Sequence, residues 1–448
     1  MKLDLENEKI SKLLWRYAIP SIIGGLVFML YNVVDRIFIS RGVGTYALSA
    51  LSLTFPLFNV LAGITAFVSV GATAKIGLKL GENKKEEAEK ILGNVFFIFI
   101  IISISLTIFG NLFIDKILYF LGANESTFSM AYDYLIILID GLFFMIFPFG
   151  IMGLMQAEGN PKKSMVAAIL GALINLCLDP IFIFVFKMGI KGAAIATVLA
   201  NVIVAIYITY HFLFGKTRYL TLRKENLKID IKLMVEVMKI GISPFFRKMA
   251  TSTTILVVNR ALISYGGSSS VAVLGIIDTI SSIIFMIVMG INEGTQPIIS
   301  YNYGAKNYKR VKETISKALI ISSIIGTMAL ITIYYSQNYI IHLFTSDIKL
   351  EKEIKDALII YMLMTPLLGF HTLGVNFFQA IDRSSIAVFL NLFRKVFLLI
   401  PLIMILSKFF GTIGIWYANP LSDFISTFVT FYFLKREFKI FKIYNKIS

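Results

Sequence analysis

Long stretches without a single charged residue constrain this chain more than any other feature of its sequence. Residues 91–114, 192–215, 318–346 and 357–381 contain no Asp, Glu, Lys or Arg. A helix of about 20 residues crosses the hydrocarbon core of a bilayer, which is about 30 Å thick. Each of the four stretches is long enough to cross, so the sequence predicts an integral membrane protein.

Further apolar stretches, in which a few charged residues are tolerated, complete the set of predicted spans. The run Phe96–Ile102 shows none of the polar–apolar alternation of an outer-membrane barrel strand. We therefore predict an all-α integral membrane protein with twelve transmembrane helices. The eight further spans are predicted near residues 13–40, 50–76, 132–157, 164–186, 237–264, 271–299, 385–407 and 412–434.

The overall composition supports a membrane protein and argues against a nucleic-acid partner. Hydrophobic residues make up 57% of the 448 residues and charged residues 16%, whereas a soluble domain has about 45–50% and about 25%. The formal net charge is +16, but the basic residues gather on one predicted membrane face without a nucleic-acid-binding motif. Membrane topology and attraction to anionic lipid explain this charge.

The distribution of Lys and Arg predicts the topology, because these residues resist translocation. Of the 43 in the chain, 29 fall on the predicted side that holds both termini and 10 on the other side. We therefore expect a multi-pass membrane protein with both termini cytoplasmic. The segment before the first span is acidic, so that span is expected to be an uncleaved anchor and not a signal peptide.

The two halves of the chain repeat each other at offsets of 222 to 224 residues. Each half holds six predicted spans, so both halves enter the membrane in the same sense, as parallel repeats do in secondary transporters. The matches, in order, are Pro20 and Val33–Arg36 with Pro244 and Val257–Arg260, Gly71 and Gly81 with Gly294 and Gly304, Gln156-Ala157 with Gln379-Ala380, and Gly189–Gly192 with Gly411–Gly414.

The repeat also predicts the domain boundaries. We expect an N-terminal six-helix lobe over residues 1–214, a cytoplasmic linker over 215–236, a C-terminal six-helix lobe over 237–434 and a cytoplasmic tail over 435–448. Because residues 215–232 are polar and basic, we expect them to form a solvated connection.

Ionisable side chains at membrane depth are costly and usually functional. Asp35 lies in the first predicted span, and Asn175 and Asp179 lie one turn apart on one face of the fifth. The sixth span carries Thr197, whose hydroxyl could simply bond the carbonyl four residues earlier. Two neighbouring carboxyl groups can share a proton, and with amide and hydroxyl oxygens they could equally hold a sodium ion. The choice between H⁺ and Na⁺ stays open.

This acidic set is confined to the first half. Asn259 occupies the position of Asp35 in the second half, and Phe397 and Pro401 lie near the positions of Asn175 and Asp179. A purely architectural cluster would more often recur in both copies. The asymmetry indicates that one lobe handles an ion.

The second half has polar residues of its own. Glu293 lies within Gly290–Pro297, where glycines and a proline predict a broken helix, and it could satisfy that backbone, pair with Arg394 or Lys395, or contact substrate. His371 is expected to be a core histidine. The other buried candidates are Asp278, Gln296, Asn376, Gln379 and Asp423.

Enzymes and channels fit the sequence poorly. The only cysteine, Cys177, cannot form an internal disulfide, and the three histidines fall in no zinc, HExxH or other catalytic motif. We expect no enzymatic activity, no cofactor and no structural metal. Repeated lobes with acidic residues on one side suit alternating access better than a continuous pore.

Several motifs together resemble the multidrug and toxic compound extrusion (MATE) family, most closely its DinF-like and MepA-like branches. The resemblance covers essentially the whole chain. The motifs are Pro20 followed by Asp35, Gln156–Lys162 (QAEGNPK), Asn175–Pro180 (NLCLDP), Glu293–Pro297 (EGTQP) and Tyr301–Ala305 (YNYGA).

The resemblance implies a V-shaped pair of six-helix lobes in the plasma membrane of a prokaryote, which exports organic cations or other amphiphilic drugs in exchange for H⁺ or Na⁺. It implies that Asp35, Asn175, Asp179 and Thr197 form the cation-coupling site, with Tyr134 near it, and that the first helix bends at Pro20. The candidates for a substrate cavity are Tyr31, Asn201, Asn259, Glu293, Gln296, Asn376 and Gln379.

The chain departs from the NorM-like branch, whose second lobe carries acidic residues in the seventh and tenth helices. Here the seventh span has Asn259, and Asp382 lies at the end of the tenth, which puts a second-lobe cation site in doubt. The alternative function is a flippase or exporter of a lipid-linked or amphiphilic anionic precursor, whose pyrophosphate would suit Arg247, Lys248, Arg394 and Lys395. One chain holds both lobes, so we expect a monomer.

Overall fold

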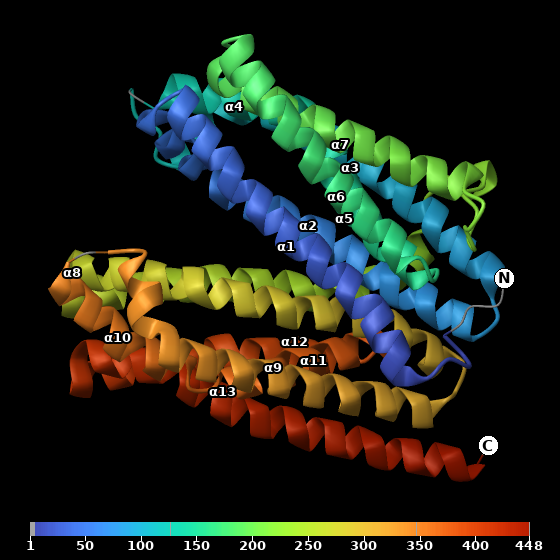
Figure 1. Ribbon diagram of the computed structural model, residues 1–448. Coiled ribbons are helices and arrows are strands. Elements are labelled where there is room, and N and C mark those ends of the chain that lie inside the picture. Colours follow the sequence, from blue (N-terminus) through green and yellow to red (C-terminus); the bar gives the residue numbers. More distant parts are fainter. Residues whose placement is uncertain (1–4, 126, 346, 448) are drawn as a thin grey trace. The chain divides into compact units, whose positions relative to one another are not determined.

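The computed structural model describes residues 5–125, 127–345 and 347–447, and these ranges contain helices and no strand. The chain divides into two compact units (Figure 1). The first unit contains Ile23–Gly241 and the described part of Met1–Glu6, and the second contains Asn7–Ile22 and the described part of Ile242–Ser448. The predicted all-α class is confirmed.

The first unit contains most of the helices of the first sequence repeat. Within it α2 packs against α3 and α5, and α6 packs against α7. Its elements are α1 (Ile10–Gly42, which begins in the second unit), α2 (Thr45–Gly81), α3 (Lys85–Phe120), α4 (Phe128–Asp140), α5 (Leu142–Ala157), α6 (Pro161–Pro180), the π-helical turn η1 (Ile181–Val185), α7 (Gly189–Phe214) and the 3₁₀ turn η2 (Lys224–Asn226).

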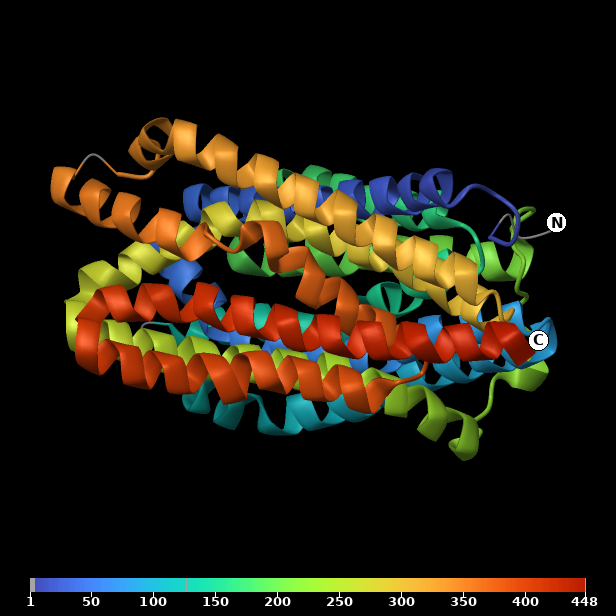
Figure 2. The ribbon, with the colours of Figure 1, turned by 90° about the horizontal axis from the view of Figure 1, so that it is seen from below.

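The second unit follows the same plan with longer continuous helices. In it α11 packs against both α9 and α13 (Figures 1 and 2). Its elements are α8 (Ile231–Gly304, which begins in the first unit), α9 (Tyr308–His342), α10 (Ile348–Met362), α11 (Thr365–Ala380), α12 (Ser384–Leu392), the π-helical turn η3 (Phe393–Leu399) and α13 (Ile400–Ile447).

The helices give the twelve predicted membrane spans. Eight helical segments of the described chain are long and apolar enough to cross a membrane. Two of them, α8 and the segment Ser384–Tyr444, each contain two spans, because Gly267 and Gly411 interrupt them with left-handed backbone. Two bent pairs of shorter helices supply the remaining spans.

Those bent pairs form the spans predicted over 132–157 and 357–381, each with a bend that the prediction did not include. Helices α4 and α5 meet at an angle of 59° at Gly141, and α10 and α11 meet at 46°. The apolar pattern runs through both bends, so hydropathy could not reveal them. The predicted break over Gly290–Pro297 was wrong, because α8 continues through these residues as regular helix.

The backbone repeats as the sequence does. Left-handed residues, which are uncommon outside glycine, recur at matching points of the two halves. The pairs are Gly44 and Gly267, Asn83 and Lys306, Gly159 and Asp382, and Gly189 and Gly411. The first three pairs are separated by 223 residues and the last by 222, so they fix the register between the two copies.

The first helix of each repeat begins in the unit formed mainly by the other repeat. The described chain enters α1 within the second unit and passes into the first unit after Ile22, two residues beyond Pro20. Helix α8 begins in the first unit and passes into the second after Gly241, three residues before Pro244. Each proline therefore lies close to the point where its helix changes unit.

Glycines allow the closest helix contacts in both units. A Cβ atom added to Gly71 would lie 2.0 Å from the carbonyl oxygen of Val237, within the first unit. In the second unit, a Cβ atom added to Gly294, the repeat mate of Gly71, would lie 2.7 Å from the backbone nitrogen of Ala18. Small residues let membrane helices approach to backbone contact in this way.

The stretch 215–232 is exposed at more than half of its residues, but it is also anchored to the rest of the first unit. The buried carboxylate of Glu158 accepts hydrogen bonds from the backbone nitrogens of Tyr219, at 3.1 Å, and Leu220, at 2.9 Å. It also pairs with the buried ring of His211. The basic composition of the stretch concealed these backbone contacts, which need an acceptor far away in the sequence.

A second buried carboxylate holds the next part of the same stretch. Glu89 accepts a hydrogen bond from the backbone nitrogen of Thr221, at 3.1 Å, and forms an ion pair with Arg223 at 2.9 Å. The Asn94 side chain accepts from the backbone nitrogen of Asp230 at 2.6 Å. The connection is therefore fixed at several points along its length.

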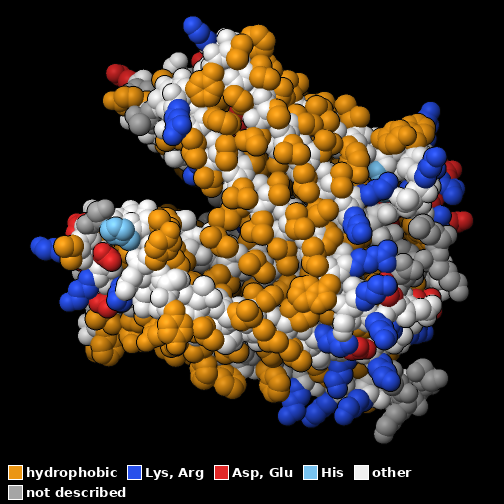
Figure 3. All heavy atoms as spheres, viewed as in Figure 1, with side chains coloured by type: hydrophobic (Ala, Val, Ile, Leu, Met, Phe, Trp, Pro, Cys, Tyr) orange, Lys and Arg blue, Asp and Glu red, His pale blue; other side chains and the backbone are white. Residues whose placement is uncertain are grey.

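The surface has the character expected in a bilayer. Hydrophobic side chains cover the sides of the helices, whereas Lys and Arg gather toward helix ends and loops (Figure 3). Large exposed side chains on the helix sides include Leu112, Ile206 and Phe428, which are 71%, 62% and 59% exposed. Lipid tails would cover such surfaces at no cost.

The glycine contacts predict which helix substitutions the fold tolerates. Gly294→Ala should lower the melting temperature, because the new methyl group meets backbone atoms of α1 and overpacking costs about 1–3 kcal/mol. Gly275→Ala, on the same helix α8 with no atom within 4 Å, should match or exceed the wild type. Thermal unfolding of the detergent-purified protein tests this, and equal melting temperatures for the two variants would refute the contact.

The Glu158 contacts predict the protease sensitivity of residues 215–232. Glu158→Gln removes one of two acceptor oxygens, so the groups that contact both oxygens can no longer all be satisfied, at about 1–3 kcal/mol for each lost bond. Trypsin should then cleave at Arg218 or Arg223 at least several-fold faster, splitting the chain into two fragments. Glu225→Gln, at an exposed position of the same stretch, is the control and should be cut at the wild-type rate.

Candidate functional site

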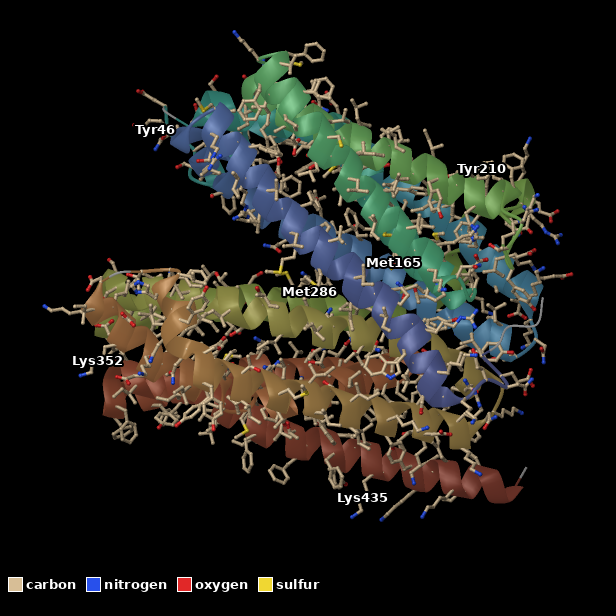
Figure 4. All side chains as sticks on the ribbon, viewed as in Figure 1. Tyr46, Met165, Tyr210, Met286, Lys352 and Lys435 are labelled. Carbon is tan, nitrogen blue, oxygen red and sulfur yellow. The ribbon has the colours of Figure 1, made fainter. Side chains whose placement is uncertain are left out.

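Four polar residues of the first unit converge from three helices. Asp35 comes from α1, Asn175 and Asp179 from α6, and Thr197 from α7. Asn175 and Asp179 are buried, with 3% and 0% of their surface exposed. Helices α6 and α7 pack side by side, and Figure 4 shows their side chains, with Met165 on α6 and Tyr210 on α7 labelled.

The amide of Asn175 connects the cluster. Its Nδ2 donates to Asp179 Oδ1 at 3.4 Å and to Thr197 Oγ1 at 3.3 Å. The Thr197 hydroxyl in turn donates to the carbonyl oxygen of Ala193 at 3.0 Å, the local bond that any threonine in a helix could make. The Thr197 hydroxyl oxygen is therefore held in place, where it accepts the hydrogen bond from Asn175 on α6.

The two carboxyl groups meet at the centre of the cluster. Asp35 and Asp179 are close enough to interact directly. Two ionised carboxylates side by side repel each other, so their proximity favours a shared proton or a bound cation. Arg36, the nearest basic residue in the sequence, does not pair with Asp35 but lies over the ring of Phe55, 4.7 Å from its centroid.

Three buried oxygens of the cluster have no hydrogen-bond donor among the described residues. They are Asp35 Oδ1, Asn175 Oδ1 and Asp179 Oδ2. An acceptor left unsatisfied in a protein interior costs about 1–3 kcal/mol, and three together in one cluster are exceptional. Converging acceptor oxygens without donors are the arrangement that a proton or a hard cation would complete.

The local sequence of α6 aims these side chains. The spacing of four residues puts Asn175 and Asp179 on one face, and Pro180 follows directly. Proline removes a backbone N–H donor, and the helix continues as the π-helical turn η1 over Ile181–Val185. Such turns are frequent at functional sites.

Two tyrosines lie near the carboxyl groups. Tyr134 is buried in α4 and Tyr31 lies one turn before Asp35 on α1, and both interact electrostatically with Asp35 and Asp179. All five residues of the predicted coupling site are thus brought together within one unit. Their role in coupling stays a prediction, because geometry alone does not show transport.

A small cavity lies beside the cluster. Its volume is about 40 Å³, and Tyr31, Asn175, Thr197 and Asn201 contribute to its lining. This is room for a water molecule or an ion and far less than the roughly 300 Å³ or more of a drug-binding pocket. Two of the predicted substrate-cavity residues, Tyr31 and Asn201, therefore border an ion-sized space.

Aromatic rings form another wall of this cavity. The Phe28 ring packs edge-to-face against Tyr31, with centroids 5.2 Å apart, and against Phe149, with centroids 5.5 Å apart. Sequence reasoning did not single out Phe28 or Phe149, since they look like any membrane phenylalanine. Only their contact with the polar cluster distinguishes them.

The other substrate-cavity candidates lie in the second unit. Asn376 Nδ2 donates to the carbonyl oxygen of Asn292 at 2.7 Å, and Gln379 Nε2 donates to Ser243 Oγ at 2.9 Å. These two amides therefore hold helices together. Gln296 is buried and Asn259 is partly buried.

Glu293 does not pair with the residues that the sequence suggested. It is exposed on α8 and interacts electrostatically with Arg247. Arg394 instead pairs with Asp423 on α13, a partner that sequence reasoning missed because the two residues are far apart along the chain. His371 is a core histidine as expected, buried beside Thr430 at 3.2 Å.

Metal-binding clusters give no further candidate. Groups of three or more His, Cys, Asp or Glu side chains that could hold a metal ion are absent from residues 5–125, 127–345 and 347–447.

Comparison with known proteins identifies the family. The MatE family model matches the chain twice, over residues 20–181 and 244–405. The multidrug export protein MepA of Staphylococcus aureus strain MRSA252 is 28% identical over 93% of this chain and 92% of its own length. MepA of Staphylococcus haemolyticus is 27% identical over 95% and 94%.

Solved structures show the same fold. An outward-facing multidrug resistance MATE transporter of the MOP superfamily superposes with a TM-score of 0.92, at 24% identity and 99% coverage of both chains. A MOP superfamily transporter from Pyrococcus furiosus gives a TM-score of 0.91 at the same identity and coverage. With the family model matching both halves of a twelve-span chain, the protein belongs to the MATE family of multidrug efflux transporters.

Proposed function

We propose that this protein exports organic cations in exchange for H⁺ or Na⁺ by alternating access. The observation that carries the proposal is the set of three buried oxygens without donors on Asp35, Asn175 and Asp179. A carboxyl group at membrane depth is tolerated when it is protonated, paired or bound to a cation. An added proton or cation would satisfy these acceptor oxygens.

The same cluster can couple two ligands. The cavity shares Asn175 and Thr197 with the ion site and adds the aromatic wall of Phe28, Tyr31 and Phe149. Aromatic faces attract organic cations. A substrate cation that approaches the carboxylates would compete with the coupling ion for their negative charge, which is the requirement of an exchanger.

The small volume of the cavity adds a constraint. At about 40 Å³ it cannot hold a drug-sized molecule in this conformation. Binding of a drug in this cavity would therefore require α1 to move relative to α6 and α7. Pro20, close to the point where α1 changes unit, is the place where that helix would bend.

Placement in the membrane completes the proposal. We place both termini on the cytoplasmic side, because Lys and Arg are concentrated in the loops on that side. The expected lobes over 1–214 and 237–434 would then be the two halves of the exchanger in a single chain, which we take to act as a monomer.

Transport into liposomes tests the coupling site. Purified protein should move the monovalent cation ethidium against its gradient when a pH gradient or a Na⁺ gradient is imposed, and the effective gradient names the ion. Asp35→Asn and Asp179→Asn keep the side-chain size but lose the ionisable group, and each should reduce gradient-driven transport at least tenfold.

The matched control lies in the same unit. Asp140→Asn changes an exposed carboxylate on α4 that accepts a hydrogen bond from Asn111 at 2.9 Å, outside the cluster, and should leave transport unchanged. Transport that persists in both Asp35→Asn and Asp179→Asn would reject the coupling site. Absence of ethidium transport under either gradient, with export of an anionic amphiphile instead, would favour the flippase.

Two carboxyl groups predict that more than one ion is exchanged for each substrate. One proton for one monovalent cation moves no net charge and uses only the pH gradient, about 1.4 kcal/mol per unit. A second ion would add the membrane potential, about 2.3 kcal/mol per 100 mV. Efflux of ethidium should therefore accelerate when a potential that is negative inside is imposed. Equal rates at zero and negative potential would show one-for-one exchange.

A further inference from the structure

The second unit contains a charged cluster that the proposed exchange does not use. Arg394 and Lys395 lie in the π-helical turn η3, and Asp423 lies on α13. The Arg394 Nε donates to Asp423 Oδ1, and the Ser422 hydroxyl donates to the carbonyl oxygen of Arg394 at 2.8 Å. These two bonds fix the backbone of Arg394 and one edge of its guanidinium group.

Most donors of this cluster remain free. Of the five N–H donors of a guanidinium, the described residues use only the one on Nε of Arg394. Lys395 makes no hydrogen bond and no ion pair within the described chain, although its side chain is only partly exposed. Charged neighbours of Lys395 are Arg394, Asp423, Asp278 and Arg247, of which Asp423 is taken by Arg394 and Asp278 accepts from the Tyr361 hydroxyl at 3.4 Å.

The internal repeat shows where this cluster lies in the fold. The left-handed pair Gly159 and Asp382 places Arg394 and Lys395 at the positions of Gly171 and Ala172. The pair Gly189 and Gly411 places Ser422 and Asp423 at the positions of Ala200 and Asn201. All four of these first-unit residues line the small cavity: Gly171, Ala172, Ala200 and Asn201.

The same location therefore has opposite character in the two units. In the first unit it is a space bordered by small residues next to two carboxyl groups, and in the second it holds two basic side chains and one acid. Asp423 pairs with Arg394, and Asp278, the other acid near Lys395, forms no ion pair with it. The Lys395 ammonium and the remaining guanidinium N–H groups therefore lack a direct oxygen partner within the described chain, and unpaired charged donors at membrane depth are costly. An anionic oxygen group would supply that partner.

We propose that the second unit binds an anionic oxygen group of an amphiphile, a carboxylate or a phosphate, at Arg394 and Lys395. A planar guanidinium binds two oxygens of such a group at once, and the adjacent ammonium supplies the balancing charge. Asp423 is a positioning residue, which holds the guanidinium through Nε and leaves its remaining N–H donors to the ligand. The π-helical turn places two consecutive basic residues at this point of the helix.

Trp416 offers a direct readout of this site. It lies seven residues before Asp423 on α13, two turns or about 10 Å along the helix, and packs in the same core cluster as Leu399. The chain has two tryptophans, and the other, Trp15, is 42% exposed. In a Trp15→Phe background, energy transfer from Trp416 to bound pyrenebutyrate reports occupancy.

The titration uses the full-length protein in phosphatidylcholine nanodiscs. Pyrenebutyrate should quench Trp416 saturably, and uncharged pyrenebutanol should bind at least tenfold more weakly. Lys395→Met should weaken pyrenebutyrate binding at least tenfold, whereas Lys395→Arg should stay within about threefold, since charge-assisted bonds are retained. Lys408→Met, at an exposed position of the same unit, is the matched control and should bind as the wild type does.

Two further measurements identify the source of the anion and distinguish binding at this site from ion binding at the coupling site. Competition by anionic phosphatidylglycerol would identify a lipid phosphate as the ligand, and its absence a free amphiphile. Asp35→Asn should bind pyrenebutyrate normally, even where it abolishes exchange. Equal affinity of the wild type for pyrenebutyrate and pyrenebutanol, or unchanged affinity in a folded Lys395→Met variant, would overturn the proposal.

Discussion

A segment that crosses hydrocarbon must satisfy every backbone N–H and C=O group within the protein, and this constraint shapes both units. It leaves helices as the only regular structure of the described chain. Departures from regular helix are confined to a few positions, where glycine, proline or a π-helical turn lies next to polar side chains. The bend at Gly141, the turn η1 after Pro180 and the turn η3 at Arg394 are of this kind.

The same constraint makes polar side chains informative. The side-chain amides of Asn376 and Gln379 donate hydrogen bonds to a neighbouring helix of the second unit, and packing alone explains their presence. Asp35 and Asp179 are different, because a donor for Asp35 Oδ1 or Asp179 Oδ2 is missing among the described residues. An unsatisfied acceptor indicates that an ion binds there, whereas a satisfied polar side chain indicates a role in helix packing.

Gene duplication gave the chain one scaffold twice, and the two copies have specialised by charge. The left-handed residues recur in register, so the frame has been retained. Within that frame Asn201 corresponds to Asp423 and Ala172 to Lys395, so small or neutral residues in one unit take the positions of charged ones in the other. A transporter built this way can offer a cation site and an anion site without a second fold.

The sequence alone determined the class, the number of spans and the repeat, because hydropathy and glycine spacing are local properties of the chain. It also pointed to Asp35, Asn175 and Asp179, since acidic residues in apolar spans are rare, and the resemblance to a family supplied Thr197 and Tyr134. Only the tertiary structure decided which oxygens lack donors, that Glu158 holds the connection between the repeats, and that Arg394 pairs with Asp423 and not with Glu293. These outcomes depend on distances between residues far apart along the chain, which side-chain packing sets and no local pattern records.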